Sequence, residues 1–217
     1  MTTHILGFPR IGAKRELKFA LEKYWKNEIN QNDLKAVGAA LRKQHWQLQN
    51  EAGLDFVTVG DFSFYDHILD TSVLLGAIPE RFNTTDSNAL DCYFRAARGR
   101  APKGADALAC DMTKWFDTNY HYIVPELHTA QTFSLNAESL FEQINEARAL
   151  GHNIKPVIVG PITYLYLSKT VDGSDRLALL AKLLPVYQKL LRQLSELSID
   201  WVQIDEPVLV LDLDATW

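Results

Sequence analysis

The residues best suited to chemistry are concentrated between Asp111 and Glu126, DMTKWFDTNYHYIVPE, where an ammonium, an indole, carboxylates, an amide, phenols and an imidazole follow one another closely. A buried polar group must be hydrogen-bonded or it costs free energy, so an apolar core has no use for so many. Lys114 and His121 in particular do not suit such a core. We interpret the stretch as the lining of a cleft, although any single member, such as Tyr122, is equally explained as a satisfied packing residue.

A second group of charges surrounds the start of an amphipathic helix, which the apolar spacing in AKRELKFALEKYWKNE predicts from about Ala13. The group comprises four cations with a single acid among them: Arg10, Lys14, Arg15, Lys18 and Glu16. Cations at a helix N-terminus oppose the helix dipole and cost stability unless an anion binds there. A solvated basic face explains the same pattern. From the residues alone, both interpretations stay open.

The elements that position these groups alternate between strands and helices. Apolar or β-branched runs predict strands over His4–Phe8, Phe56–Val59, Lys155–Gly160 and Ile199–Ile204, with a further apolar run over Val208–Leu213. Helical patterns cover Asn32–Ala52, Tyr65–Leu75, Ala89–Ala97, Asn136–Gly151 and Asp175–Leu197, the last bent or interrupted at Pro185. About five strands in this order predict an α/β fold with a parallel sheet that is buried on both faces.

Polar residues recur directly after the predicted strands, where parallel α/β proteins bind their ligands whether the sheet is open or closed. They are Arg10, Asp61, Thr163, Asp205 and Glu206. No glycine-rich phosphate loop and no Gly-x-Ser-x-Gly turn follows any of these strands, which weakens nucleotide-binding and hydrolase hypotheses.

The composition restricts the classes of partner. The chain has 217 residues, 47% of them hydrophobic, which suffices for one substantial domain. Its net charge of −5 argues against nucleic acid and anionic membranes as partners, so an anionic ligand requires local cations. Cys92 and Cys110 lack metal-ligand spacing, which favours buried thiols in a reducing cytoplasm. We find no signal peptide and no apolar run long enough to cross a bilayer, and we expect a cytoplasmic protein.

Five blocks carry a resemblance to a known family: LGFPRIGAKRELKFALEKYW, VGDFSFYDH, DMTKWFDTNYHYIVPE, KPVIVGPITYLYL and WVQIDEPVLVL. In this order they resemble the N-terminal part of cobalamin-independent methionine synthase, the 5-methyltetrahydropteroyltriglutamate–homocysteine methyltransferase. The resemblance covers almost the whole chain. It implies two facing (β/α)8 barrels, of which the C-terminal one holds the catalytic zinc and the homocysteine site.

The motifs of that second barrel are absent here, so the resemblance implies that residues 1–217 form a truncated N-terminal, folate-binding TIM-type barrel of about five strands. It also implies that Arg15, Glu16, Leu17, Lys18 and Lys114 contact the polyglutamate tail of methyltetrahydrofolate. Arginine and lysine bind such carboxylates through charge-assisted hydrogen bonds. We therefore expect Lys18 and Lys114 to meet beside the strand ends. No catalytic residue or metal ligand is assigned to this chain, and we expect Asp205 and Glu206 to stabilise strand ends.

The resulting hypothesis is an enzyme that transfers the methyl group of the folate triglutamate to homocysteine, with zinc and without cobalamin, while this segment alone is inactive. Its partners are the two substrates and the C-terminal barrel. Because an incomplete barrel leaves open edges and apolar faces, we also expect copies of the segment to associate. One alternative is a stand-alone binding module that has lost catalysis. Another is a small complete enzyme that uses Asp61, His121 and Asp205 as acids and bases.

Overall fold

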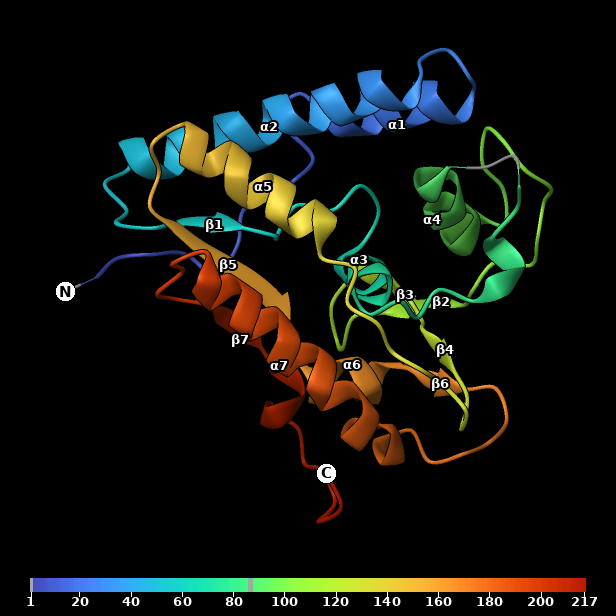
Figure 1. Ribbon diagram of the computed structural model, residues 1–217. Helices are drawn as coiled ribbons and strands as arrows, with labels where there is room; N and C mark the ends of the chain where they lie inside the picture. Colours follow the sequence, from blue (N-terminus) through green and yellow to red (C-terminus); the bar gives the residue numbers. More distant parts are fainter. Residues whose placement is uncertain (1, 86–87) are drawn as a thin grey trace. The chain divides into compact units, whose positions relative to one another are not determined.

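The apolar run predicted over Lys155–Gly160 forms strand β5 (Ile154–Val159) of a parallel sheet in the computed structural model, which describes residues 2–85 and 88–217 (Figure 1). The sheet has the order β1-β5-β7. Strand β1 (Val57–Val59) pairs in parallel with β5, from Val57 opposite Ile154 to Val59 opposite Pro156. Every residue of both strands is buried, as expected for a parallel sheet covered on both faces. The predicted α/β class with a parallel sheet is confirmed.

The remaining elements follow in chain order. The helices are α1 (Glu16–Trp25), α2 (Gln31–Glu51), α3 (His67–Leu74), α4 (Ala89–Arg98), α5 (Glu138–Ala149), α6 (Pro161–Leu167) and α7 (Leu180–Glu196). The other strands are β2 (Met112–Lys114), β3 (His121–Ile123), β4 (Glu126–Leu127), β6 (Lys169–Thr170) and β7 (Gln203–Asp205). Short 3-10 turns cover Glu80–Phe82, Leu177–Leu179 and Pro207–Val210. No helix in the described ranges is long and apolar enough to span a membrane.

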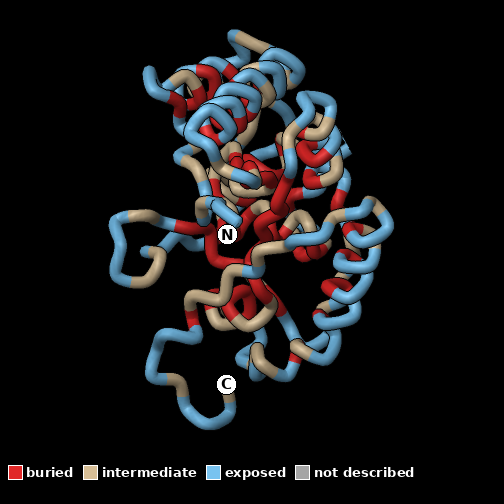
Figure 2. Tube along the Cα trace, turned by 90° about the vertical axis from the view of Figure 1, so that its left-hand side faces the viewer, coloured by how far each residue is buried: buried red, intermediate tan, exposed pale blue. Residues whose placement is uncertain are grey.

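The chain divides into two compact units. The first comprises Met1–Phe64, Glu138–Ile158 and Ile199–Gln203, and the second comprises Tyr65–Ala137, Val159–Ser198 and Ile204–Trp217. Helices α1, α2, α5 and α7 bury one side and expose the other, and buried and exposed residues alternate along such stretches of the trace (Figure 2).

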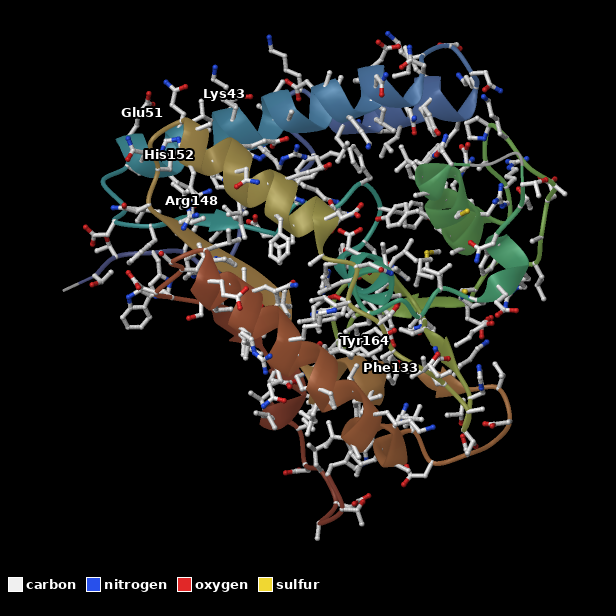
Figure 3. All side chains as sticks on the ribbon, in the orientation of Figure 1. Lys43, Glu51, Phe133, Arg148, His152 and Tyr164 are labelled. Atoms are coloured by element: carbon white, nitrogen blue, oxygen red, sulfur yellow. The ribbon has the colours of Figure 1, made fainter. Side chains whose placement is uncertain are left out.

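The first unit is held together by contacts of helix α2. Its start carries a capping box between Asn30 and Asp33, which satisfies main-chain N–H groups that a helix end leaves open. The exposed side chains of Lys43 and Glu51 mark its outer side (Figure 3). On its inner side, the Arg42 guanidinium makes a two-point contact of 2.8 Å per hydrogen bond with the Glu146 carboxylate of α5. Helix α2 therefore ties α5 to the sheet.

The second unit is organised around helix α3. The Asp66 carboxylate accepts hydrogen bonds from Ile68 N and Leu69 N at the start of α3, and a third from Ile123 N of β3. Strands β2 and β3 form an antiparallel hairpin, and β4 pairs in parallel with β6. Tyr164 of α6, labelled in Figure 3, is fully buried and its hydroxyl lies 3.1 Å from Ser72 Oγ of α3. These contacts join α3 to both the hairpin and α6.

Three sequence predictions need correction. The segment His4–Phe8 is not a strand, and Leu6 is 75% exposed. Within the described part of the chain, the main chain of this segment is contacted by the side chains of Lys155 and Gln203 and not by a neighbouring strand. The first helix begins at Glu16 instead of Ala13, after a turn with left-handed residues. Helix α7 continues through Pro185, so it is not interrupted there, and a bend at Pro185 stays a prediction.

The apolar run Val208–Leu213 begins within the Pro207–Val210 3-10 turn, and Leu209 and Val210 are 63% and 86% exposed. Large exposed apolar side chains are the kind of surface on which the expected association between copies would depend. That association stays a prediction.

Candidate functional site

The turn before α1 places cations at the start of a helix. We call residues 9–18 the basic segment. Gly12 adopts φ +82°, a conformation that favours glycine, and a Cβ there would lie 2.2 Å from Glu16 Oε2. Arg15 is the N-cap residue with φ 61°, and its main-chain N–H donates to Gly12 O over 3.1 Å. A non-glycine residue in this region costs free energy, and such strain gathers at functional sites.

The two central residues of the predicted Arg15–Lys18 site shape the turn. The Glu16 carboxylate accepts a hydrogen bond of 2.9 Å from Lys14 N, which explains an acid within a cationic segment. Leu17 is 1% exposed, so it is a packing residue of the first unit. The Leu17 N–H donates to Ile11 O, which closes the turn onto the helix. Within this stretch, the side chains directed to solvent are therefore those of Arg15 and Lys18.

Lys18 is placed one turn into α1. Its side chain is 48% exposed, and its ammonium lies 3.7 Å from the carboxylate of Glu22 on the same helix. An exposed pair of this kind contributes little stability and exchanges readily for another carboxylate. Lys18 can therefore accept an anionic ligand at small cost.

Lys114 lies in the second unit, on strand β2, where it is exposed and stands opposite His121 of β3. The neighbouring indole of Trp115 packs edge to face on His67, with ring centroids 4.4 Å apart, which supports the packing role over ligand contact. Tyr122 is buried and donates to Leu167 O, and burial raises its pKa to about 12, so this member of the stretch is a packing residue. The expected meeting of Lys114 with Lys18 stays a prediction, since the two residues belong to different units.

The polar residues that follow strands have structural partners. Glu206 accepts hydrogen bonds from Ile162 N at 3.0 Å and Thr163 N at 2.6 Å, so its carboxylate satisfies the start of α6. Gly160 makes this possible, because a Cβ there would lie 2.1 Å from the Glu206 carboxyl carbon. The Glu206 carboxylate thus satisfies a helix start, whereas the sequence predicted that Asp205 and Glu206 stabilise strand ends.

The three residues of the alternative acid and base site are spread over both units, Asp61 in the first and His121 and Asp205 in the second. Asp61 Oδ2 accepts from Phe8 N and Thr58 Oγ1 over 2.7 and 2.8 Å. The His121 imidazole contacts Asn119 O at 3.0 Å. Each of these two residues is therefore engaged by its own neighbourhood.

The resemblance implies that zinc binds outside this chain. The described residues contain no group of three His, Cys, Asp or Glu side chains able to hold a metal ion. Burial, reinforced by Glu126, raises the pKa of the Cys110 thiol to about 12, which disfavours the thiolate that binds zinc. We assign no zinc ligand to this chain.

One buried acid was not anticipated from the sequence. Asp66 is 1% exposed, and burial raises its pKa to about 7 in spite of three main-chain N–H donors. An aspartate directly before a helical pattern is a recognised start signal, which could have identified its capping role. Its contact with β3 is visible only in the folded chain.

Comparison with known proteins supplies the family. The protein family described as "Cobalamin-independent synthase, N-terminal domain" matches residues 2–217. The 5-methyltetrahydropteroyltriglutamate–homocysteine methyltransferases of Vibrio cholerae and Photobacterium profundum are 55% and 56% identical, over 100% and 99% of this chain and 29% and 28% of their own lengths. The chain thus spans less than a third of these curated relatives.

A structural comparison agrees at the level of the fold. The B12-independent methionine synthase of Shewanella sp. W3-18-1, solved in complex with selenomethionine, matches with a TM-score of 0.54 and 18% identity, over 82% of this chain and 44% of that one. Together with the match over residues 2–217, these relatives place the chain in the cobalamin-independent synthase family, as its N-terminal domain.

Proposed function

We propose that this chain is the folate-tail-binding part of an enzyme that transfers the methyl group of 5-methyltetrahydropteroyltri-L-glutamate to L-homocysteine and so forms L-methionine. The named activity of the relatives from Vibrio cholerae and Photobacterium profundum supports the reaction. Arg15, Glu16, Leu17, Lys18 and Lys114 form the proposed tail site. Lys114 is included in this site because the family resemblance assigns it there.

The observation that carries the proposal is the strained turn that presents two solvent-directed cations at the start of α1. Arg15 adopts φ 61° and Lys18 is 48% exposed. A glutamate tail is a row of carboxylates, which a guanidinium and an ammonium bind by charge-assisted hydrogen bonds. The helix dipole adds attraction for the same negative charge. Glu16 and Leu17 contribute by fixing the turn.

In this proposal the chain binds and orients the methyl donor. It performs no step of the methyl transfer itself. The parallel sheet is proposed to be part of a TIM-type barrel, and the homocysteine and zinc sites are assigned to the C-terminal barrel of the family. Burial raises the pKa of the Cys110 thiol to about 12, which disfavours its thiolate. We further propose that the 217-residue chain binds folate without turnover.

The test is a titration of the chain with 5-methyltetrahydrofolate that carries one or three glutamates. We expect the triglutamate to bind more tightly, and we expect Lys18→Ala to weaken it by about fivefold, the range of an exposed ion pair. Lys114→Ala should act in the same direction. The matched control is Lys23→Ala, which removes an exposed cation from the last turn of the same helix. Equal affinity for both tails in the unaltered chain would overturn the proposed function.

A further inference from the structure

The main chain that leads into the basic segment is held by side chains from elsewhere in the first unit. Lys155 Nζ donates to Ile5 O over 2.8 Å, and Gln203 Nε2 donates to Leu6 O over 2.9 Å. At the last residue before the segment, Phe8 N donates to Asp61 Oδ2 over 2.7 Å. The contact with Asp61 therefore determines where the basic segment begins.

The Asp61 carboxylate is itself held by a second hydrogen bond. The oxygen that accepts from Phe8 N also accepts from Thr58 Oγ1, at 2.8 Å. Thr58 is fully buried in β1, and its main-chain N–H donates to Gln49 Oε1 of α2 over 2.9 Å. The indole N–H of Trp46, also on α2, donates to Thr58 O over 2.7 Å. The carboxylate is thus tied through β1 to the longest helix of this unit.

The surroundings of Phe8 leave its main chain little freedom. The Phe8 ring stacks against the buried His45 of α2, with ring centroids 4.6 Å apart. At the neighbouring Gly7, an added Cβ would stand 3.6 Å from Asp61 Oδ2, so even a methyl group there would reach van der Waals contact with the carboxylate. A small shift of this carboxylate would accordingly be transmitted to the main chain.

The other end of the turn has its own fixed point. The Glu16 carboxylate accepts a hydrogen bond from Lys14 N, and Leu17 is buried on the inner side of α1. With α1 fixed by Leu17 and the entry fixed by Asp61, the turn that carries Arg15 is constrained at both ends. Each of these acids uses one oxygen on a main-chain N–H group, Glu16 Oε2 on Lys14 N and Asp61 Oδ2 on Phe8 N.

We propose that Asp61 is a positioning residue for the basic segment: by holding Phe8 N it sets where Arg15 and Lys18 stand when the glutamate tail binds. The inference rests on the proposed function and adds to it a residue outside the predicted tail site. Asp61 acts through the main chain, since a carboxylate near a polyanion would by its charge alone weaken binding.

The charge effect and the positioning effect of Asp61 have opposite signs, which makes a direct test possible. If Asp61 acted by charge, Asp61→Asn would tighten binding of the triglutamate. If it acts by position, Asp61→Asn weakens the triglutamate by up to about tenfold, because the hydrogen bond from Phe8 N then has a neutral acceptor in place of a charged one, and it leaves the monoglutamate nearly unchanged. Asp61→Glu keeps the charge and moves the carboxylate by one methylene, so it should also reduce the preference for three glutamates.

The matched control is Asp55→Asn, which removes the same charge from a similar acceptor, the one that receives Thr3 N over 2.7 Å at the start of the same extended stretch. We expect it to keep the preference of the unaltered chain. The readout is the ratio of the two folate affinities, because partial unfolding lowers both affinities equally and leaves their ratio unchanged. An unaltered ratio in both Asp61 variants would overturn the inference.

Two further outcomes separate this inference from the proposed function. An unaltered chain that does not distinguish the two tails refutes the proposed function itself. An unaltered chain that does distinguish them, with Asp61→Asn as selective as Asp55→Asn, refutes only the positioning role. Failure of both Asp61 variants to fold would assign Asp61 to stability and would equally overturn the inference.

Discussion

Replacement of Arg15 by glycine should stabilise the chain while it weakens binding. Arg15 holds φ 61°, a left-handed conformation that costs an L-residue about 1–2 kcal/mol and costs glycine almost nothing. Against this gain stands the greater freedom of glycine in the unfolded chain, about 0.5–1 kcal/mol. The comparison variant is Lys14→Gly, since Lys14 is adjacent, carries the same charge and is not among the described residues with positive φ.

The entropic term of glycine is common to both variants, so their difference isolates the cost of the left-handed backbone. We expect Arg15→Gly to exceed Lys14→Gly in free energy of unfolding by about 1–2 kcal/mol. For a chain of 217 residues, each kcal/mol corresponds to about 2–4 °C in Tm. Thermal and urea unfolding measure the difference, and the folate titration measures the loss of triglutamate affinity. If the two variants were equally stable, the argument that Arg15 is strained for function would fail.

Two predictions concern the second unit. Glu206→Gln should destabilise the chain by about 1–3 kcal/mol, because an amide offers one acceptor oxygen to the two N–H groups at the start of α6. Urea unfolding measures this loss of stability. An unchanged free energy of unfolding would show that these contacts contribute nothing. Burial raises the pKa of Asp66 from 3.8 to about 7, so the folded state holds a proton that the unfolded state has lost, and stability falls as pH rises from about 4 to 7. Asp66→Asn should flatten this dependence in unfolding curves recorded across that range, whereas an equally steep curve in the variant would show that other groups cause it.

Several predictions from local pattern were correct because their signals are local. Continuous apolar residues identified β5, and helical spacing identified α2 to within one residue at each end. The start of the first helix was misplaced because nothing in the spacing of apolar residues reveals that Arg15 adopts a left-handed backbone. The strand predicted at His4–Phe8 failed for another reason. Strand character depends on a partner strand, and an isolated apolar run does not specify one.

The sequence by itself determined the family, the α/β class and the identity of the cations in the basic segment, since these depend on residue order and local spacing. Only the tertiary structure decided what the acids do. Glu16 closes a turn, Asp61 holds Phe8 N and Glu206 satisfies the start of α6. An aspartate or glutamate in a sequence does not indicate whether its carboxylate binds a ligand or a main-chain N–H. The difference lies in which donors the fold brings within hydrogen-bond distance.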